Sequence, residues 1–394
     1  MRAMRAALGR PWVLSAAALA TLAGLAGVAV GGPASNPDDI KASIAPDNAR
    51  ICRISYVPVS LELGTPLTPG APMGIAVPST VGPQQVLVKL CIPRSKPTTS
   101  VVQLLVHGIT YDHRYWNIAD PSNPKGDRYS WEATAAKAGY ATLAIDRIGN
   151  GDSTHPPSVF VDINSNATVV HQVVQALRAG TIASPTTPTK FKQVVLIGHS
   201  YGSMTSWFEA SRYQDVDALV ITSATHNVHE LTSAASIESA HYPAILDPQF
   251  AGTTLDPGYV TSMPGKRYDQ YYAPADVDLG IVARDEATKG TFTQSEVYNY
   301  PVIFRTQLDI RVPVFLIIGS LDGIFCSQIA IDLAAPCQSS AALIANERPW
   351  YGPNVPSIDA HIVRGAGHDL NAMYSSQQTF NTVTQWLTQK VPSH

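Results

Sequence analysis

The chain has 394 residues, of which 45% are hydrophobic and only 14% are charged. That hydrophobic content supports a full buried core and excludes wholesale disorder, and the length suits one large α/β domain. The formal net charge is −3, and no dense run of Lys or Arg follows the first ten residues. We therefore expect no nucleic-acid partner. The low charge, with 30 prolines, favours a secreted protein over a cytosolic one.

The first segment has the three parts of a secretory signal peptide. Three arginines within the first ten residues precede an uncharged stretch over residues 11–30, and small residues follow up to Ala34. An uncleaved membrane anchor is the alternative, which the Ala and Gly content of the stretch disfavours. We expect residues 1–34 to be a signal peptide, and the mature chain to be secreted with no stable membrane anchor.

Four cysteines in a chain expected to be exported predict two disulfides. Cys52 and Cys91 lie in two early strand-like runs, and Cys326 and Cys337 bracket a short loop. Of the three possible pairings, Cys52 with Cys91 and Cys326 with Cys337 is the simplest geometrically. Metal ligation is disfavoured, because no CxxC or nearby HxxxH motif accompanies these cysteines.

Apolar runs and helical periodicity predict an antiparallel opening pair of strands, followed by strands and helices in alternation. The pair covers residues 50–63 and 84–92, joined by a Pro- and Gly-rich connection. Further strands are expected at residues 101–106, 141–145, 193–197, 218–222, 312–318 and 360–363, and helices at residues 129–138, 164–178, 200–213 and 377–390. This alternation predicts an α/β fold, with a mostly parallel sheet of about eight strands and helices on both faces.

One long segment, residues 225–311, interrupts this alternation with prolines, glycines and many tyrosines. An insertion of this length between two core strands is usually a cap over an active site. We therefore expect a core formed by residues 35–226 and 312–394, with a mainly helical cap at residues 227–311.

The strongest motif is Gly198-His199-Ser200-Tyr201-Gly202, which follows an apolar strand and opens a helix. This setting is that of a nucleophile elbow, in which a sharp turn exposes the serine hydroxyl above the sheet. Only glycine fits where positions 198 and 202 approach neighbouring backbone. Ser200 is therefore the expected nucleophile.

A serine nucleophile needs a base and a group that orients the base. Asp322 follows the strand expected at 312–318, and His368 follows the last strand. Both stand at the C-terminal ends of strands, where the catalytic groups of parallel sheets gather. We expect Asp322 to orient His368 and His368 to act as the base. Asp369 is expected to cap the turn or the following helix, and His361 to have a structural role.

Two backbone N–H groups are expected to form an oxyanion hole. One belongs to Tyr201, and the other to Ile109 in the segment that follows the strand 101–106. Thr110 is the alternative donor. His107 is expected to bond backbone beneath this loop.

These motifs resemble those of the α/β-hydrolase fold family, in particular its secreted esterase- and lipase-like serine hydrolases. Residues 146–153, which read D-R-I-G-N-G-D-S, resemble a turn whose role in that family is structural. The resemblance spans about residues 101 to 390 and implies a triad that requires no cofactor and no metal. Epoxide hydrolases and haloalkane dehalogenases of the family carry an aspartate at the elbow, so Ser200 argues against those reactions.

The expected activity is hydrolysis of a small-molecule carboxylic ester outside the cell, through an acyl-enzyme on Ser200. A secreted peptidase or amidase, a lactonase, and a catalytically silent binding protein remain alternatives. A peptidase would need an acid in the cap to hold a substrate amine, and the candidates are Glu230, Glu238, Asp247 and Asp256. Candidate pocket walls are Tyr111, Trp116, Tyr201, Trp207 and the tyrosines of the cap, with burial in ordinary packing as an equal alternative for each. Asn166 begins a glycosylation sequon.

Overall fold

The computed structural model describes residues 49–63, 75–76, 81–124, 126–187, 189–226, 240–326 and 337–393. The expected signal peptide lies outside these residues. No helix among the described residues is long and apolar enough to cross a membrane.

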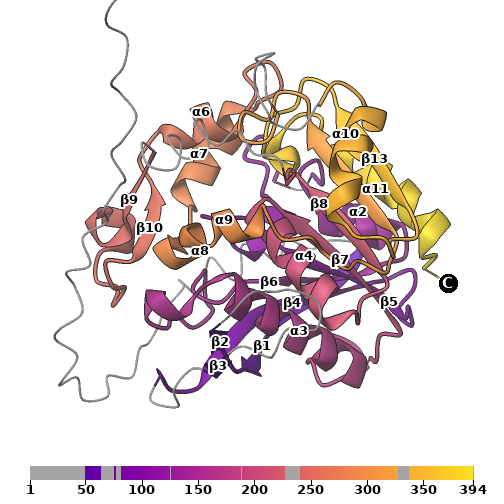
Figure 1. Ribbon diagram of the computed structural model, residues 1–394, viewed down its shortest axis with the longest axis horizontal. Helices are drawn as coiled ribbons and strands as arrows, with labels where there is room; N and C mark the ends of the chain where they lie inside the picture. Colours follow the sequence, from indigo (N-terminus) through magenta and orange to yellow (C-terminus); the bar gives the residue numbers. More distant parts are fainter. Residues whose placement is uncertain are drawn as a thin grey trace, which may run out of the picture.

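An eight-stranded sheet forms the centre of the molecule, in the order β1-β4-β6-β5-β7-β8-β12-β13 (Figure 1). β1 (Arg50–Val59) is antiparallel to β4 (Gln84–Pro93), which is antiparallel to β6 (Ala141–Ile145). The other neighbours are parallel, through β5 (Val101–Val106), β7 (Gln193–His199), β8 (Ala218–Thr222), β12 (Val314–Gly319) and β13 (Ile358–Val363). The prediction of a mostly parallel sheet of about eight strands is confirmed.

Helices cover both faces of this sheet. Successive side chains of a strand point to opposite sides, so each face presents its own apolar residues for helices to pack against. Val102 and Leu104 of β5 pack in one hydrophobic cluster, and Val101 and Leu105 in the other. The first cluster includes residues of α3 (Ile163–Ala179), α4 (Tyr201–Tyr213) and α10 (Ser340–Glu347), and the second includes residues of α2 (Trp131–Lys137) and α11 (Ser376–Lys390).

Local sequence signals set the ends of these helices. Asp162 and Ser165 form a capping box at the start of α3, and Gly180 ends the helix in the left-handed conformation at φ 73°. The helix expected over residues 164–178 is therefore found with a difference of one residue at each end.

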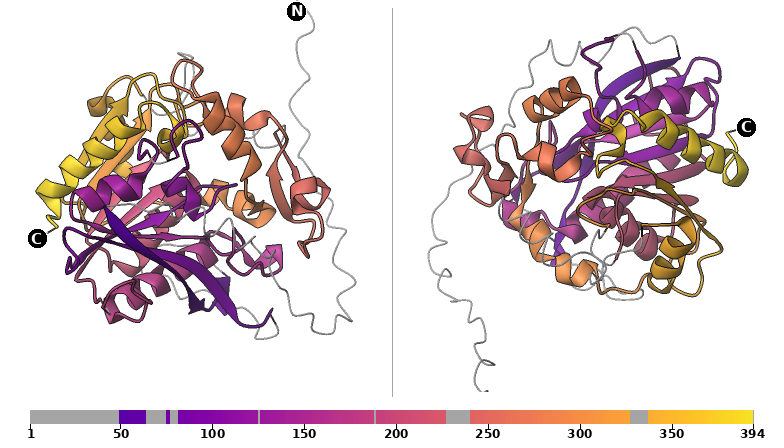
Figure 2. Two further views of the ribbon diagram at one scale, coloured as in Figure 1. Left: turned by 180° about the vertical axis from the view of Figure 1, so that it is seen from behind. Right: turned by 90° about the horizontal axis from the view of Figure 1, so that it is seen from above.

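The insertion between β8 and β12 contains helices and a second small sheet. The helices are α6 (Lys266–Tyr271), α7 (Leu279–Ala287), α8 (Gln294–Tyr298) and α9 (Tyr300–Ile303). The antiparallel sheet has the order β11-β10-β9 and consists of β9 (His241–Pro243), β10 (Tyr259–Ser262) and β11 (Phe292–Thr293). The expectation of a mainly helical cap missed this sheet, because strands of two to four residues are too short to show an alternating pattern. Figure 2 shows these elements gathered on one side of the molecule, away from the C-terminus.

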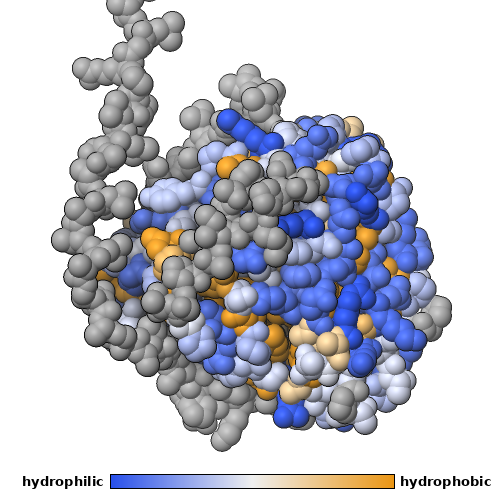
Figure 3. Space-filling view, turned by 60° about the horizontal axis from the view of Figure 1, so that its bottom comes forward, coloured by the Kyte–Doolittle hydropathy of each residue, from blue (hydrophilic) through white to orange (hydrophobic). Residues whose placement is uncertain are grey.

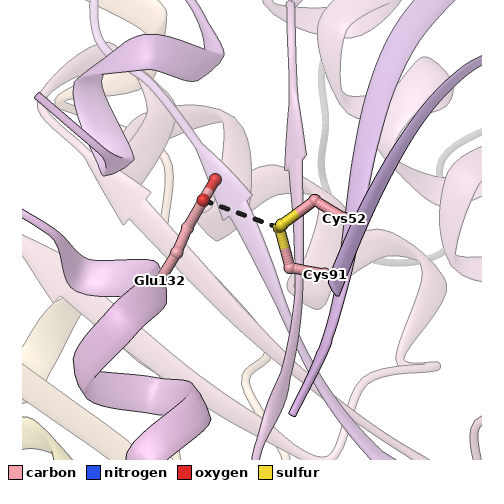
Figure 4. Close-up of side chains that lie close together, drawn as sticks. All are labelled: Cys52, Cys91 and Glu132. Atoms are coloured by element: carbon pink, nitrogen blue, oxygen red, sulfur yellow. Dashed lines mark hydrogen bonds between the residues drawn. A yellow bond between two sulfur atoms is a disulfide. The ribbon is translucent and has the colours of Figure 1, made fainter. Parts of the chain in front are cut away.

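Both disulfides join the expected pairs, Cys52 with Cys91 and Cys326 with Cys337. Figure 4 shows that Glu132 points toward the first bond, with one carboxylate oxygen 3.6 Å from the Cys91 sulfur. The same oxygen lies 2.9 Å from Nζ of Lys89, so the charge of this buried carboxylate is paired with a cation.

Polar residues cover most of the molecular face in Figure 3, with hydrophobic residues gathered between them. Among the described residues, most exposed large hydrophobic side chains belong to the insertion. They are Ile245, Leu246, Leu279, Tyr298 and Val302.

Candidate active site

The turn between β7 and α4 holds Ser200 in a strained conformation, with φ 53° and ψ −119°. Its N–H donates to the carbonyl of Thr222, 2.9 Å away on the neighbouring strand β8. The flanking glycines leave no room for a side chain. A Cβ on Gly202 would lie 2.1 Å from the carbonyl oxygen of Val106, and one on Gly198 would lie 2.4 Å from the Gly202 oxygen. These contacts explain both glycines of the motif.

Asp322 and His368 lie in direct contact, although 46 residues separate them in the chain. Asp322 follows β12 and His368 follows β13, and Oδ2 of the acid is 2.9 Å from Nδ1 of the imidazole. The other carboxylate oxygen accepts the N–H groups of Ile324 and Phe325 at 2.9 and 3.1 Å, which fixes its orientation. Burial alone would lower the pKa of His368, but the charge and hydrogen bond of Asp322 outweigh it and raise that pKa.

The serine turn and the His368 loop are in contact at the C-terminal ends of the strands. Ser223, which follows β8, donates its hydroxyl to the carbonyl of His368 at 2.7 Å. The ring of His199, the residue before Ser200, has its centroid 5.0 Å from that of His368. The structure thus brings Asp322 and His368 into contact and holds the Ser200 turn beside them.

The loop after β5 packs against Ser200. A Cβ built on Gly108 would lie 3.1 Å from the Cβ of Ser200, so this backbone nearly touches the serine. The N–H of Thr110, the alternative oxyanion donor, already donates to the carbonyl of Thr291 in the insertion at 3.3 Å. Ile109 therefore remains the candidate in this loop. The other candidate, the Tyr201 N–H, lies in the first turn of α4, where a helix provides no backbone acceptor.

His107 bonds backbone beneath this loop, as predicted. Its Nδ1 lies 2.8 Å from the carbonyl oxygen of Gly108, and its Nε2 accepts the Arg147 N–H at 2.9 Å. Burial, helped by the charge of Arg147, lowers the pKa of His107 to about 3. The ring is therefore neutral at physiological pH, with its single proton on Nδ1.

A family model described as "Alpha/beta hydrolase family" matches residues 103–381, well over half of the chain. The chain belongs to the alpha/beta hydrolase family. The resemblance inferred from the motifs is thereby confirmed, together with the fold.

Solved structures similar to this hydrolase include the peroxisomal alpha-beta-hydrolase Lpx1 of Saccharomyces cerevisiae, with 11% identity and a TM-score of 0.48 over 88% of this chain and 91% of that chain. A thermophilic esterase from Thermogutta terrifontis has 13% identity and a TM-score of 0.48, with coverages of 84% and 98%. An enol-lactonase from Burkholderia xenovorans has 14% identity and a TM-score of 0.48, with coverages of 77% and 97%. No curated protein matches the hydrolase.

Asp369 has a different role in the hydrolase from the one predicted. Its side chain makes no capping bond to the short helix that follows it, η7 (Leu370–Ala372). One carboxylate oxygen accepts the Tyr111 hydroxyl, and the other lies 3.2 Å from Nε2 of His199. Burial raises the pKa of Asp369 to about 6, against the opposing charges of His368 and Arg267. These contacts could not be predicted from local sequence patterns, because His199 and Tyr111 are 170 and 258 residues away.

Three groups near the serine turn, His199, His368 and Asp369, place polar atoms within 4.8 Å of one another, as a metal site would require. Each group already has a protein partner. Nδ1 of His368 bonds Asp322, and Asp369 bonds Tyr111 and His199. These hydrogen bonds engage polar atoms of each of the three side chains.

Two of the four acids proposed to hold a substrate amine have partners within the hydrolase. Asp247 lies 2.7 Å from Nζ of Lys289, and Asp256 accepts the hydroxyl and N–H of Ser158 at 2.6 and 2.8 Å. Asp247 is thus paired with a cation, and Asp256 is bonded to the backbone and hydroxyl of Ser158. The other two candidates, Glu230 and Glu238, lie outside the described residues.

The aromatic residues proposed as pocket walls mostly serve the core of the hydrolase. Trp116, Tyr201 and Trp207 have no exposed surface, and Nε1 of Trp207 donates to the Tyr351 hydroxyl at 2.7 Å. Of the two alternatives considered for these three residues, burial in ordinary packing is the one found. Tyr111 retains slight exposure and bonds Asp369.

Proposed function

We propose that this hydrolase cleaves a carboxylic ester outside the cell, through an acyl-enzyme on Ser200 with His368 as base and Asp322 as its orienting acid. The observation that carries the proposal is the buried 2.9 Å contact between Asp322 and His368, beside a serine held at positive φ on a strand-to-helix turn. A serine without such a base is a poor nucleophile.

In this mechanism Asp322 holds the Nδ1 proton of His368, which leaves Nε2 free to accept a proton. Nε2 takes the Ser200 proton while Oγ attacks the ester carbonyl, and the oxyanion is stabilised by the N–H groups of Ile109 and Tyr201. The tetrahedral intermediate expels the alcohol, which receives the proton from His368. Water then attacks the acyl-enzyme with the same base, and release of the acid regenerates Ser200.

Two features favour an uncharged, partly apolar ester over a peptide. Asp247 and Asp256, the described acids proposed to capture an amine, bond Lys289 and Ser158 instead. The insertion also exposes several large hydrophobic side chains, including Leu246. A lactone would use the same catalytic residues and remains the second candidate.

Labelling with a fluorophosphonate probe tests this function, since the probe reacts with an activated serine. We expect wild type to label and Ser200→Ala not to label, with kcat for p-nitrophenyl esters lower by about 10⁵-fold in the variant. Ser206→Ala, on the same helix, is the matched control and should keep both properties. An aminoacyl anilide should be a much poorer substrate than the ester.

Two results would contradict the proposal. A folded wild-type protein that neither labels nor hydrolyses esters would favour the binding-protein alternative. Faster cleavage of the anilide than of the ester would favour the amidase.

A further inference from the structure

The guanidinium of Arg147 is buried where the core, the loop after β5 and the insertion meet. Nη1 donates to Oδ1 of Asn166 at 3.0 Å and forms an ion pair with Glu296 of α8. Nη2 lies 3.4 Å from the carbonyl oxygen of Gly108. The cation also stands over the ring of Tyr201, with Cζ 4.9 Å from the centroid. Arg147 thus touches both segments that carry the proposed oxyanion donors.

The orientation of one peptide group follows from these contacts. In a trans peptide the carbonyl and the following N–H point in opposite directions. The Gly108 carbonyl accepts from Nδ1 of His107 at 2.8 Å and from Arg147, so it is held from the side of the turn after β6. The N–H of Ile109 then points the opposite way, and this backbone packs on Ser200.

We propose that Arg147 is a positioning residue of the oxyanion hole, which holds the Gly108–Ile109 peptide with its N–H toward Ser200 and is itself held by Glu296 of the insertion. This inference rests on the function proposed above. It also gives Arg147 a part in catalysis that the structural role implied for residues 146–153 does not include.

The surroundings of Glu296 make the arrangement rigid. Its carboxylate accepts the Thr293 N–H at 2.7 Å and the Asn166 amide at 3.1 Å, and the Arg147 and Glu296 side chains have no exposed surface. A buried ion pair with further hydrogen bonds keeps both charges in one geometry. The same contacts bury Asn166, so the sequon offers no accessible acceptor in the folded chain.

The contacts of Arg147 depend on the planar, forked shape of its guanidinium group. One guanidinium reaches the Gly108 carbonyl, Asn166 and Glu296 together, whereas the ammonium of lysine is a compact point charge. Loss of the fork leaves the His107 ring as the remaining side-chain donor to this carbonyl, so the peptide can rotate more readily. A rotated peptide would direct a carbonyl dipole, instead of an N–H, at the developing negative charge.

Steady-state kinetics and a trifluoromethyl ketone inhibitor, whose bound form carries an oxyanion, test the proposal. For Arg147→Met we expect kcat to fall about tenfold with KM changed less than about twofold, since complete loss of a donor costs about 100-fold or more. The inhibition constant should rise by the factor by which kcat/KM falls. For Arg147→Lys we expect the same pattern, with kcat lower by about threefold.

Val174→Ala is the control, because it removes buried α3 side-chain atoms about two helical turns after Asn166. It should lower the melting temperature without changing kcat or the inhibition constant. If Arg147 had a purely structural role, Arg147→Met would behave like this control, with a lower melting temperature and an unchanged kcat and inhibition constant.

Wild-type kcat and wild-type ketone affinity in a folded Arg147→Met enzyme would overturn the inference and leave the proposed function intact. If Arg147→Met does not fold, the same result for Arg147→Lys would overturn it. A wild-type protein that is folded but unlabelled and inactive would overturn both the function and this inference.

Discussion

His368 has two carboxylates close by, Asp322 at its Nδ1 and Asp369 as the next residue. Burial lowers the pKa of His368, but both acids raise it and the net pKa is above its usual value near 6.5. A base must be neutral to accept the serine proton. We therefore expect kcat/KM to rise with pH, with a midpoint above about 6.5.

Asp369→Asn removes one of the two negative charges. The imidazolium then loses stabilisation, so the midpoint of the kcat/KM profile should move to lower pH while activity at high pH is retained. The profile measured with a p-nitrophenyl ester from about pH 4 to pH 9 checks this shift. Asp127→Asn, on the surface beside Lys137, should leave the midpoint unchanged. A midpoint that stays or rises in Asp369→Asn would contradict the prediction.

Helices α6 and α7 of the insertion are joined to each other by a buried ion pair. Arg267 donates to Asp285 at 2.8 and 2.7 Å and to the Thr110 hydroxyl at 2.7 Å, and its cation lies over the ring of Tyr111. This pair therefore connects the insertion to the loop that carries Ile109.

Removing one partner should leave an uncompensated buried charge. We expect Asp285→Asn to lower the free energy of unfolding by about 3–5 kcal/mol, and Arg267→Met with Asp285→Leu to lower it by less. Chemical denaturation of the two proteins checks this order. A larger loss in the double variant would mean that the pair stabilises the fold beyond the cost of burying its charges.

Elements with long apolar runs could be predicted from the sequence. The bounds of β6 and β8 match those expected, because both strands are buried on both faces and are apolar apart from one threonine each. Helix α10 was not expected, and neither were β9, β10 and β11. Short elements of this kind are stabilised by tertiary contacts, and their own sequences carry little periodicity.

The sequence was sufficient to predict which residues of the candidate site lie together, as far as this depends on their place after a strand. Ser200, Asp322 and His368 each follow a core strand, and the parallel sheet brings such positions to one edge. The contacts of Asp369 with Tyr111, and of Arg147 with Glu296, were not predicted. They depend on how loops and the insertion fold over the core, which local patterns do not describe.

The two disulfides and the expected signal peptide together predict that the chain is exported. Expressed with residues 1–34, the chain should be recovered outside the cytosol with a new N-terminus after position 29 to 34. Intact-mass analysis after thiol blocking should show no free cysteine. Chain made without this leader in a reducing cytosol should lack both bonds, and its free energy of unfolding should be lower by more than about 3 kcal/mol.

Two findings would contradict this prediction. One is an exported protein that retains residues 1–34, which would favour the membrane-anchor alternative. The other is equal stability of the oxidised and reduced chains.

The position of β1 gives the Cys52–Cys91 bond a further consequence. β1 is an edge strand of the main sheet, and Cys52 stands directly opposite Cys91 in its pairing with β4. Edge strands can slip in register or exchange with a strand of another copy, and a slip of one residue turns every side chain to the wrong face. A covalent link between opposed residues forbids both movements. The bond thus fixes the alignment of the edge strand and protects the chain against strand exchange at this edge.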